Sequence, residues 1–177
     1  PVSSLSDGAP IEFDISASGD DYIDLANSQL YVRMKITKAD GSPIVQDEKV
    51  GPINNILHSL FSQVDILLNG TQITDLSNTY AYRAYVEDVL SFGGEAKKSH
   101  LTCSLYYKDE AGKMDNNDPS VADTNSGLVT RSAYTAGGRE VDMVGRLHAD
   151  IFFQSRYKLN EVNLKIKLTR SKDSFCL

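Results

Sequence analysis

Apolar and polar side chains alternate along several well-separated segments of the chain. Between residues 29 and 38 every second residue is apolar, starting at Leu30, and between residues 161 and 170 the same alternation starts at Val162. Successive side chains of a strand point to opposite faces, so each segment has one buried face and one solvated face. Such strands are typical of antiparallel sheets, because the buried strands of βαβ units read as continuous apolar runs. The pattern predicts a β-sandwich.

Turn signals divide the rest of the chain into further short segments. Asn69-Gly70 is a strong hairpin signal, and Gly19-Asp20-Asp21 and Gly137-Gly138 predict additional turns. We expect about eight strands in all, drawn from residues 11–16, 22–25, 29–38, 64–68, 71–74, 101–107, 128–131, 141–144, 146–153 and 161–170.

Two segments have helical spacing instead. Residues 53–61 predict one or two helical turns, and residues 78–92 predict a full helix that Gly93-Gly94 can end. We expect its apolar stripe to pack against the sandwich, and the stripe consists of Tyr82, Tyr85, Val86, Val89 and Leu90. A stacking platform for a ligand is the alternative role of its tyrosines, Tyr80, Tyr82 and Tyr85.

The predicted fold class is all-β: an antiparallel β-sandwich of jelly-roll type, with about eight strands and one inserted α-helix. The chain has no Trp, so it lacks the Cys-Trp-Cys pattern of an immunoglobulin domain. Residues 1–177 suit a single domain. The apolar residues Phe175-Cys176-Leu177 follow closely on a predicted strand, and they predict that this domain belongs to a longer polypeptide.

The composition is that of an ordinary globular protein, with 41% hydrophobic residues, 24% charged residues and a net charge of −6. No apolar run approaches the roughly 20 residues that span a bilayer, so we expect no membrane span. The basic residues Lys165, Lys167, Arg170 and Lys172 fit a solvated strand face better than a phosphate track, so no specific nucleic acid partner is expected. Cys103 and Cys176 are expected to be reduced thiols, with one bridge between them left open.

No catalytic constellation is evident among the reactive residues. His148 shares the wet face of its predicted strand with Asp150, and His100 precedes Cys103 by three residues; His58 stands apart. Neither pair has a third or fourth ligand nearby in sequence, so a metal site would need residues from elsewhere in the fold. Phosphate-binding glycine loops and nucleophile elbows are missing from the sequence. We expect a protein that is not an enzyme, with no catalytic, cofactor-binding or metal-binding residues.

Residues 108–126 read as a long polar loop, a kind of segment that is often functional or mobile. Residues 115–118 are acidic but lack the glycine and the closing glutamate of an EF-hand, which favours a flexible loop over a calcium site. Asn69-Gly70-Thr71 matches a glycosylation acceptor, although the hairpin turn explains it sufficiently. We expect the long loop to project outward or to clasp a neighbouring subunit.

Several stretches, in order from about residue 13 to residue 177, carry a resemblance to a known family. They are GPINNILHSLFSQVDILLNG at 51–70, NTYAYRAYVEDVLSFGGEAKKSHL at 78–101, YKDEAGKMD at 107–115, VDMVGRLHADIFFQSRYKLN at 141–160 and LTRSKDSFCL at 168–177. Together they resemble the major capsid protein of Polinton (Maverick) elements and of their adintovirus-like relatives.

The resemblance implies a double jelly-roll protein, in which three subunits form a pseudo-hexagonal capsomer of an icosahedral viral shell. This chain would then be the first jelly roll, the N-terminal half of a longer double jelly-roll chain. The implied partners are further copies of itself in a homotrimer and neighbouring capsid proteins such as a penton protein. The implied location is the virion, assembled inside the host cell, and the family offers no catalytic residues. A lectin-like carbohydrate-binding β-sandwich module is the alternative function.

Overall fold

The computed structural model describes residues 1–2, 5, 8–16 and 20–177. In this part of the chain, helices and strands are mixed. The strands are β1 (Ile11–Ile15), β2 (Leu30–Met34), β3 (Phe61–Leu68), β4 (Thr71–Gln72), β5 (Val141–Gly145) and β6 (Leu164–Arg170). The helices are α1 (Ile56–Ser59), α2 (Tyr80–Ser91), α3 (Gly94–Lys98), α4 (Ser126–Thr135) and α5 (Asp173–Cys176), with the 3₁₀ turns η1 (His100–Ser104), η2 (Ala136–Gly138) and η3 (Asp150–Phe153).

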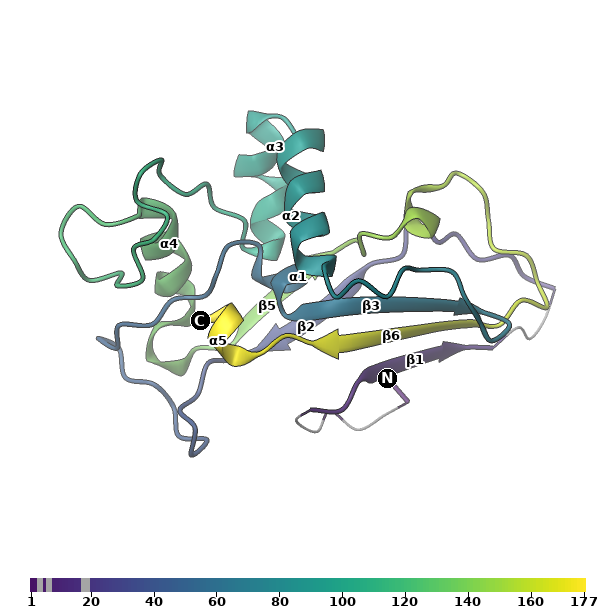
Figure 1. Ribbon diagram of the computed structural model, residues 1–177, viewed down its shortest axis with the longest axis horizontal. Coiled ribbons are helices and arrows are strands. Elements are labelled where there is room, and N and C mark those ends of the chain that lie inside the picture. The colour runs from purple at the N-terminus through teal and green to yellow at the C-terminus, as the bar shows by residue number, and fades with distance from the viewer. Residues whose placement is uncertain (3–4, 6–7, 17–19) are drawn as a thin grey trace.

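The strands form two sheets, one with the order β1-β6-β3-β4 and one that pairs β2 with β5 (Figure 1). Every pairing is antiparallel, and Ile166 of β6 lies opposite both Phe13 of β1 and Ile66 of β3. Helices α2 and α3 rise from one side of the sheets, and α4 lies at the end away from the β3–β4 hairpin (Figure 1).

The alternation found in the sequence is confirmed where the strands pair. In β6 the side chains of Leu164, Ile166 and Leu168 are buried, and the residues between them are half-buried. The hairpin at Asn69-Gly70 is also confirmed. Both residues have positive φ, 49° and 81°, as a type I′ turn requires, and glycine adopts this conformation without strain.

The core lies where the two sheets and the nearby helical turns meet. Ile66 and Leu164 of the larger sheet, Met143 of β5, Leu57 of α1 and Phe152 of η3 are all at most 2% exposed. Burying each of these side chains contributes about 1.5–3 kcal/mol, so this cluster is the main source of stability.

The predicted all-β jelly-roll sandwich of about eight strands is wrong, because the described residues form only six strands and several helices. Three segments predicted as strands, 101–107, 128–131 and 146–153, contain η1, part of α4 and η3 instead. Short apolar runs fit a buried helical turn as well as a strand. At α4 the side chain of Asn125 decides the outcome, because its Oδ1 accepts a hydrogen bond from the Gly127 N–H at 3.1 Å and caps the helix.

Other predicted elements are present in shortened form. The strand expected at 29–38 is reduced to β2, and residues 22–25 contribute only a bridge between Ile23 and Lys158. Gly19 of the predicted turn lies outside the described residues. The longest described helix, α2, has 12 residues, and none of the described helices combines the length and apolar character needed to cross a membrane.

Helix α2 occupies the predicted range but is rotated about its axis relative to the prediction. Its inner face carries Ala81, Ala84 and Asp88, whereas Val86 and Leu90 of the predicted buried stripe are 52% and 79% exposed. Alanines allow the helix to approach its neighbours closely. The apolar stripe therefore faces outward, which the periodicity alone did not indicate.

Replacing Leu164 by alanine should lower the free energy of unfolding by about 2–5 kcal/mol, because the cavity would open in the best-packed part of the core. Leu76→Ala is the matched control, since this leucine is 76% exposed and its replacement should cost less than about 0.5 kcal/mol. Urea unfolding followed by circular dichroism measures both. Equal losses for the two variants would contradict the assigned core.

Candidate functional site

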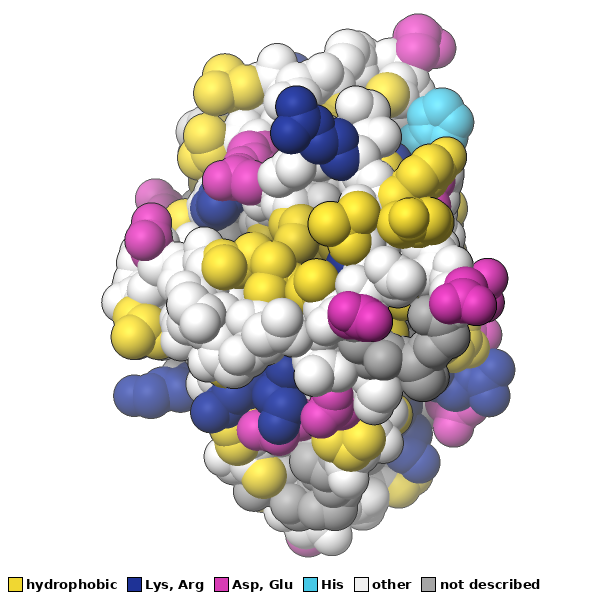
Figure 2. All heavy atoms as spheres, turned by 90° about the vertical axis from the view of Figure 1, so that its right-hand side faces the viewer, with side chains coloured by type: hydrophobic (Ala, Val, Ile, Leu, Met, Phe, Trp, Pro, Cys, Tyr) yellow, Lys and Arg dark blue, Asp and Glu magenta, His cyan; other side chains and the backbone are white. Residues whose placement is uncertain are grey.

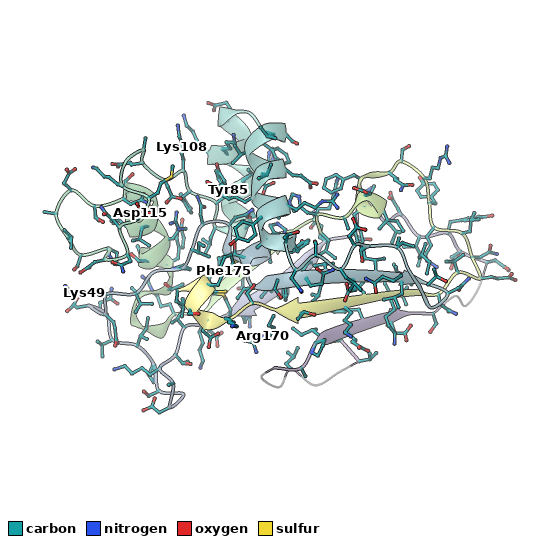
Figure 3. The ribbon with its side chains drawn as sticks, viewed as in Figure 1. Lys49, Tyr85, Lys108, Asp115, Arg170 and Phe175 are labelled. Atoms are coloured by element: carbon teal, nitrogen blue, oxygen red, sulfur yellow. The ribbon has the colours of Figure 1, made fainter. Side chains whose placement is uncertain are left out.

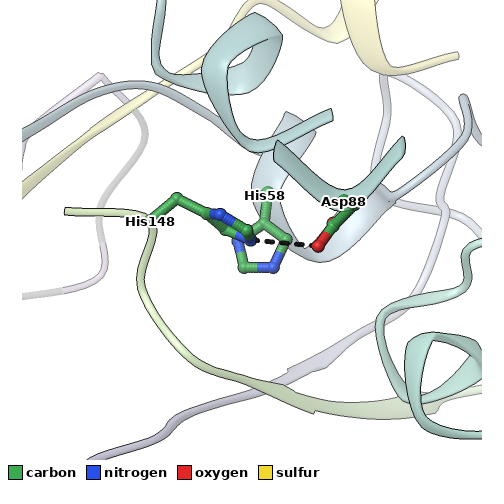
Figure 4. A group of neighbouring side chains, drawn as sticks. All are labelled: His58, Asp88 and His148. Atoms are coloured by element: carbon green, nitrogen blue, oxygen red, sulfur yellow. Dashed lines mark ion pairs between the residues drawn. The ribbon is translucent and has the colours of Figure 1, made fainter. Parts of the chain in front are cut away.

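Two histidines and an aspartate meet inside the protein, although they are far apart in the sequence. His58 comes from α1, Asp88 from α2 and His148 from the segment that follows β5 (Figure 4). The three residues are 3%, 1% and 6% exposed. One ring nitrogen of each histidine and one carboxylate oxygen of Asp88 all lie within 4.8 Å of one another.

Each member of this histidine cluster (His58, Asp88 and His148) is held by a further polar side chain. Nδ1 of His148 lies 2.7 Å from the Glu87 carboxylate, and Nε2 of the same ring lies 3.5 Å from Oδ1 of Asp88. The other oxygen of Asp88 accepts a hydrogen bond from the Asn55 amide at 2.6 Å. The ring of His58 is bonded through Nδ1 to the Tyr80 hydroxyl at 3.1 Å.

The local backbone explains why these side chains converge. Asn55 precedes α1 in the left-handed conformation, with φ of 56°, which asparagine tolerates better than most residues. In α2, Tyr80, Ala84 and Asp88 follow one another at intervals of four, so they share the inner face. The Tyr80 hydroxyl also accepts a hydrogen bond from the backbone N–H of His148 at 3.2 Å, which ties α2 to the segment after β5.

Burial dominates the electrostatics of the cluster. It lowers the pKa of His58 well below its ordinary value, helped by the neighbouring His148, so this imidazole is neutral. Burial also raises the pKa of Asp88, against the opposing effects of His148 and Asn55. For Glu87, burial would raise the pKa, but hydrogen bonds from His148 and Arg83 hold it below its usual value.

The pairs suggested by the sequence are not the ones that the structure forms. His148 is buried and not on a solvated strand face, whereas Asp150 is exposed and bonded to Arg83. His100 is exposed on η1 together with Cys103. The sequence held one signal for Asp88. This charged residue shares one side of the predicted helix with Ala81 and Ala84, and that side is opposite the apolar stripe.

The three tyrosines of α2 do not form one stacking platform. Tyr80 is buried against the histidine cluster, Tyr82 lies 5.8 Å from the Phe175 ring, and Tyr85 lies 6.0 Å from the Tyr106 ring, measured between ring centroids. The tyrosines therefore point to three different neighbours.

A second buried polar group surrounds Asp109 and fixes the two ends of the long loop. Its carboxylate accepts hydrogen bonds from Arg131 at 3.0 Å, from Asn125 at 2.8 Å and from Asn54 at 2.9 Å. Arg131 is 3% exposed and also donates to the Pro52 carbonyl at 2.9 Å. Asp115 lies far out in this loop, away from α5 and the sheets (Figure 3). The loop is anchored at its base and exposed at its tip.

Other charged residues of interest form ordinary surface pairs. Asp118 accepts hydrogen bonds from Lys49 and Ser120, which lower the pKa of its carboxyl to about 2. On β6, the Nζ of Lys165 lies 3.6 Å and 3.8 Å from the carboxylates of Glu12 and Asp14. Acidic side chains of β1 therefore compensate part of the basic strand face, which fits the solvated face expected from the sequence.

Comparison with known proteins provides one distant relative. The chain is 29% identical over 176 residues to the uncharacterized protein F54H12.2 of Caenorhabditis elegans, a match that covers 95% of this chain. The chain spans about two fifths of that protein, since the match covers 39% of its length. No protein-family model matches the chain, and no solved structure matches it.

Replacing Arg131 by glutamine should lower the free energy of unfolding by about 3–5 kcal/mol, because the Asp109 carboxylate, whose side chain is 13% exposed, would lose its cationic partner. Arg156→Gln is the control, since Arg156 is exposed. Thermal unfolding measures both variants. A loss for Arg131→Gln no larger than that of the control would show that the pair does not hold the loop.

The two cysteines are free and should differ in reactivity. Burial and the nearby Asp173 raise the pKa of Cys176 to about 11, so at pH 8 its thiol is almost fully protonated. Iodoacetamide at pH 8 should therefore modify exposed Cys103 in the folded chain and modify Cys176 only after unfolding. Mass spectrometry counts the adducts, and Cys103→Ser is the control. Rapid native modification of that variant would contradict the buried position of Cys176.

Proposed function

We propose that the chain is part of a structural capsid protein, which acts through protein–protein contacts and not through catalysis. In this proposal it is the N-terminal part of a longer subunit, three copies of which form a capsomer of the virion. The sequence resemblance supports this assignment, as do the surfaces described below. The proposal concerns the role of the protein and does not depend on the predicted jelly-roll architecture.

The observation that carries the proposal is the outward apolar stripe of α2. Tyr82, Val86 and Leu90 follow one another at intervals of four residues, so their side chains lie in a row. They are 62%, 52% and 79% exposed. The stripe extends onto α5, where the centroid of the Phe175 ring lies 5.8 Å from that of Tyr82, and onto Leu177, which follows α5 and is 51% exposed.

An exposed row of large apolar side chains is unfavourable unless a partner covers it. Each such side chain gains about 1.5–3 kcal/mol on full burial, so three of them make a substantial contribution to association. Contiguous apolar patches of this kind mark interaction sites on soluble proteins. Residues of both charge signs lie beside the stripe on α2, where Arg83 and Glu87 form an ion pair. A second copy of the same chain, with the same mixture of charges, is the occupant that we propose.

Further surfaces suit a subunit with several neighbours. At the end of the molecule that carries the β3–β4 hairpin, hydrophobic side chains gather between charged ones (Figure 2). At the opposite end, the loop at 108–126 extends from its anchor at Asp109. Stable association typically buries about 800 Å² per partner in each interface. The greater length of the C. elegans relative supports the idea of a longer subunit.

The double substitution Val86→Gln and Leu90→Gln should weaken trimer formation at least about tenfold, because it removes apolar area from the contact. Glutamine is a good helix former, so α2 should remain intact. The matched control is Val45→Gln, since Val45 is 60% exposed and belongs to the segment between β2 and α1. The complete polypeptide is expressed, its mass is measured by sedimentation, and particles are viewed by electron microscopy.

The expected results are trimers and hexagonal capsomers for the unchanged protein and the control, and monomers of unchanged thermal stability for the double variant. A complete polypeptide that stays monomeric would contradict the proposed function. A double variant that assembles as well as the control would show that α2 is not the contact.

A further inference from the structure

We propose that His58, Asp88 and His148 bind a divalent transition-metal ion of the zinc type, which fixes α2 to the body of the protein. Two imidazoles and one carboxylate are a common protein ligand set for such ions, with a water molecule in the remaining position. The site is assembled from three separate parts of the chain, and its ligand atoms lie within 4.8 Å of one another.

The distances already approach those of a coordinated ion. In a tetrahedral site with bonds of about 2.0–2.1 Å, neighbouring ligand atoms are about 3.4 Å apart. The distance between Nε2 of His148 and Oδ1 of Asp88 is 3.5 Å. These two ligands therefore need almost no rearrangement. The His58 ring lies against the His148 ring, with centroids 4.6 Å apart and planes at 89°, so a small adjustment completes the set.

The outer partners of the three residues match the pattern of a metal site. Metal-binding histidines usually hold their second ring nitrogen with a hydrogen bond to a carboxylate or another polar group. Here Glu87 holds Nδ1 of His148, and Tyr80 holds Nδ1 of His58. Asn55 in turn holds the oxygen of Asp88 that faces away from His148. In each ligand, one polar atom is fixed by the protein and the other is left for the ion.

A purely hydrogen-bonded cluster explains less of the arrangement. Such a cluster accounts for His148, which links Glu87 and Asp88, and for Nδ1 of His58, which is bonded to Tyr80, but it leaves Nε2 of His58 without a role. Within the described part of the chain, Nε2 of His58 has no hydrogen-bond partner, and the residue is 3% exposed. The fully enclosed side-chain atoms without a partner in this part of the chain are Oδ1 of Asn55, beside Asp88, and Oγ of Ser171. An ion would give Nε2 of His58 a partner and would also balance the charge of Asp88.

The three ligands are buried. Three protein ligands with an open fourth position are the number found in catalytic zinc sites, whereas structural sites usually have four. The role proposed for the ion rests on the separate parts of the chain that it would join. A recess of about 330 Å³ lies beside the cluster, and its lining includes Tyr80, Arg83 and His148. A bound ion would link α1, α2 and the segment after β5 at one point.

The test is titration of the purified chain with Co²⁺, whose visible absorption reports tetrahedral coordination, together with measurement of bound zinc after dialysis. One equivalent of metal is expected, and Zn²⁺ should raise the thermal midpoint. Asp88→Asn and His148→Gln should each weaken Co²⁺ binding at least tenfold. His100→Gln is the matched control, since this histidine is exposed and outside the cluster, and it should bind like the unchanged chain.

A second variant covers the case in which the ligand substitutions prevent folding, as judged by circular dichroism. Glu87→Gln leaves all three ligands in place and should weaken binding about 10–100-fold, because it removes the partner that orients His148. The proposal is overturned if the folded, unchanged chain binds less than about a tenth of an equivalent of Co²⁺ or zinc. It is also overturned if Glu87→Gln and the folded ligand variants bind as tightly as His100→Gln.

Discussion

The burial of Asp88 is the constraint on which the arrangement of α2 depends. A carboxylate inside a protein costs several kcal/mol unless polar partners surround it. Asn55 and His148 supply those partners only when this face of α2 points inward. Turning the helix over would bury Val86 and Leu90 but would leave the polar groups of Asn55, His58 and His148 without their partners. The polar cluster, and not the apolar stripe, therefore determines which side of the helix faces the body of the protein.

The strands could be predicted from the sequence where one face is buried and the other solvated. β1, β6 and the Asn69-Gly70 hairpin follow directly from alternation and turn chemistry. The prediction failed at residues 128–131, because four residues are too few to separate a helical period from a strand period. There the Asn125 cap, which lies outside the apolar run, selects the helix. With α4 and the 3₁₀ turns in place of strands, the eight-stranded sandwich could not form.

The histidine cluster could not be predicted as a unit, since residues 58, 88 and 148 are brought together only by the tertiary fold. Two members gave a weak local signal: His58 lies within an apolar segment, and Asp88 follows two alanines on one side of a predicted helix. The usual assumption that the most apolar side of a helix is its buried side concealed the second signal. Where a charged residue and small residues share one side of a predicted helix, that side is better treated as the buried one, with a polar site at the charged residue.

The buried cluster and the exposed stripe are two consequences of one helix orientation. Association is strengthened when the contact surface is rigid before binding, because less conformational freedom is lost. The hydrogen bonds of Asp88, Tyr80 and His148 hold α2 at two places, Tyr80 in its first turn and Glu87-Asp88 two turns later, and a metal ion at Asp88 would restrict the helix further. A helix held in this way presents Tyr82, Val86 and Leu90 in a fixed row. The inner polar contacts thus prepare the outer apolar surface for the neighbour that we propose.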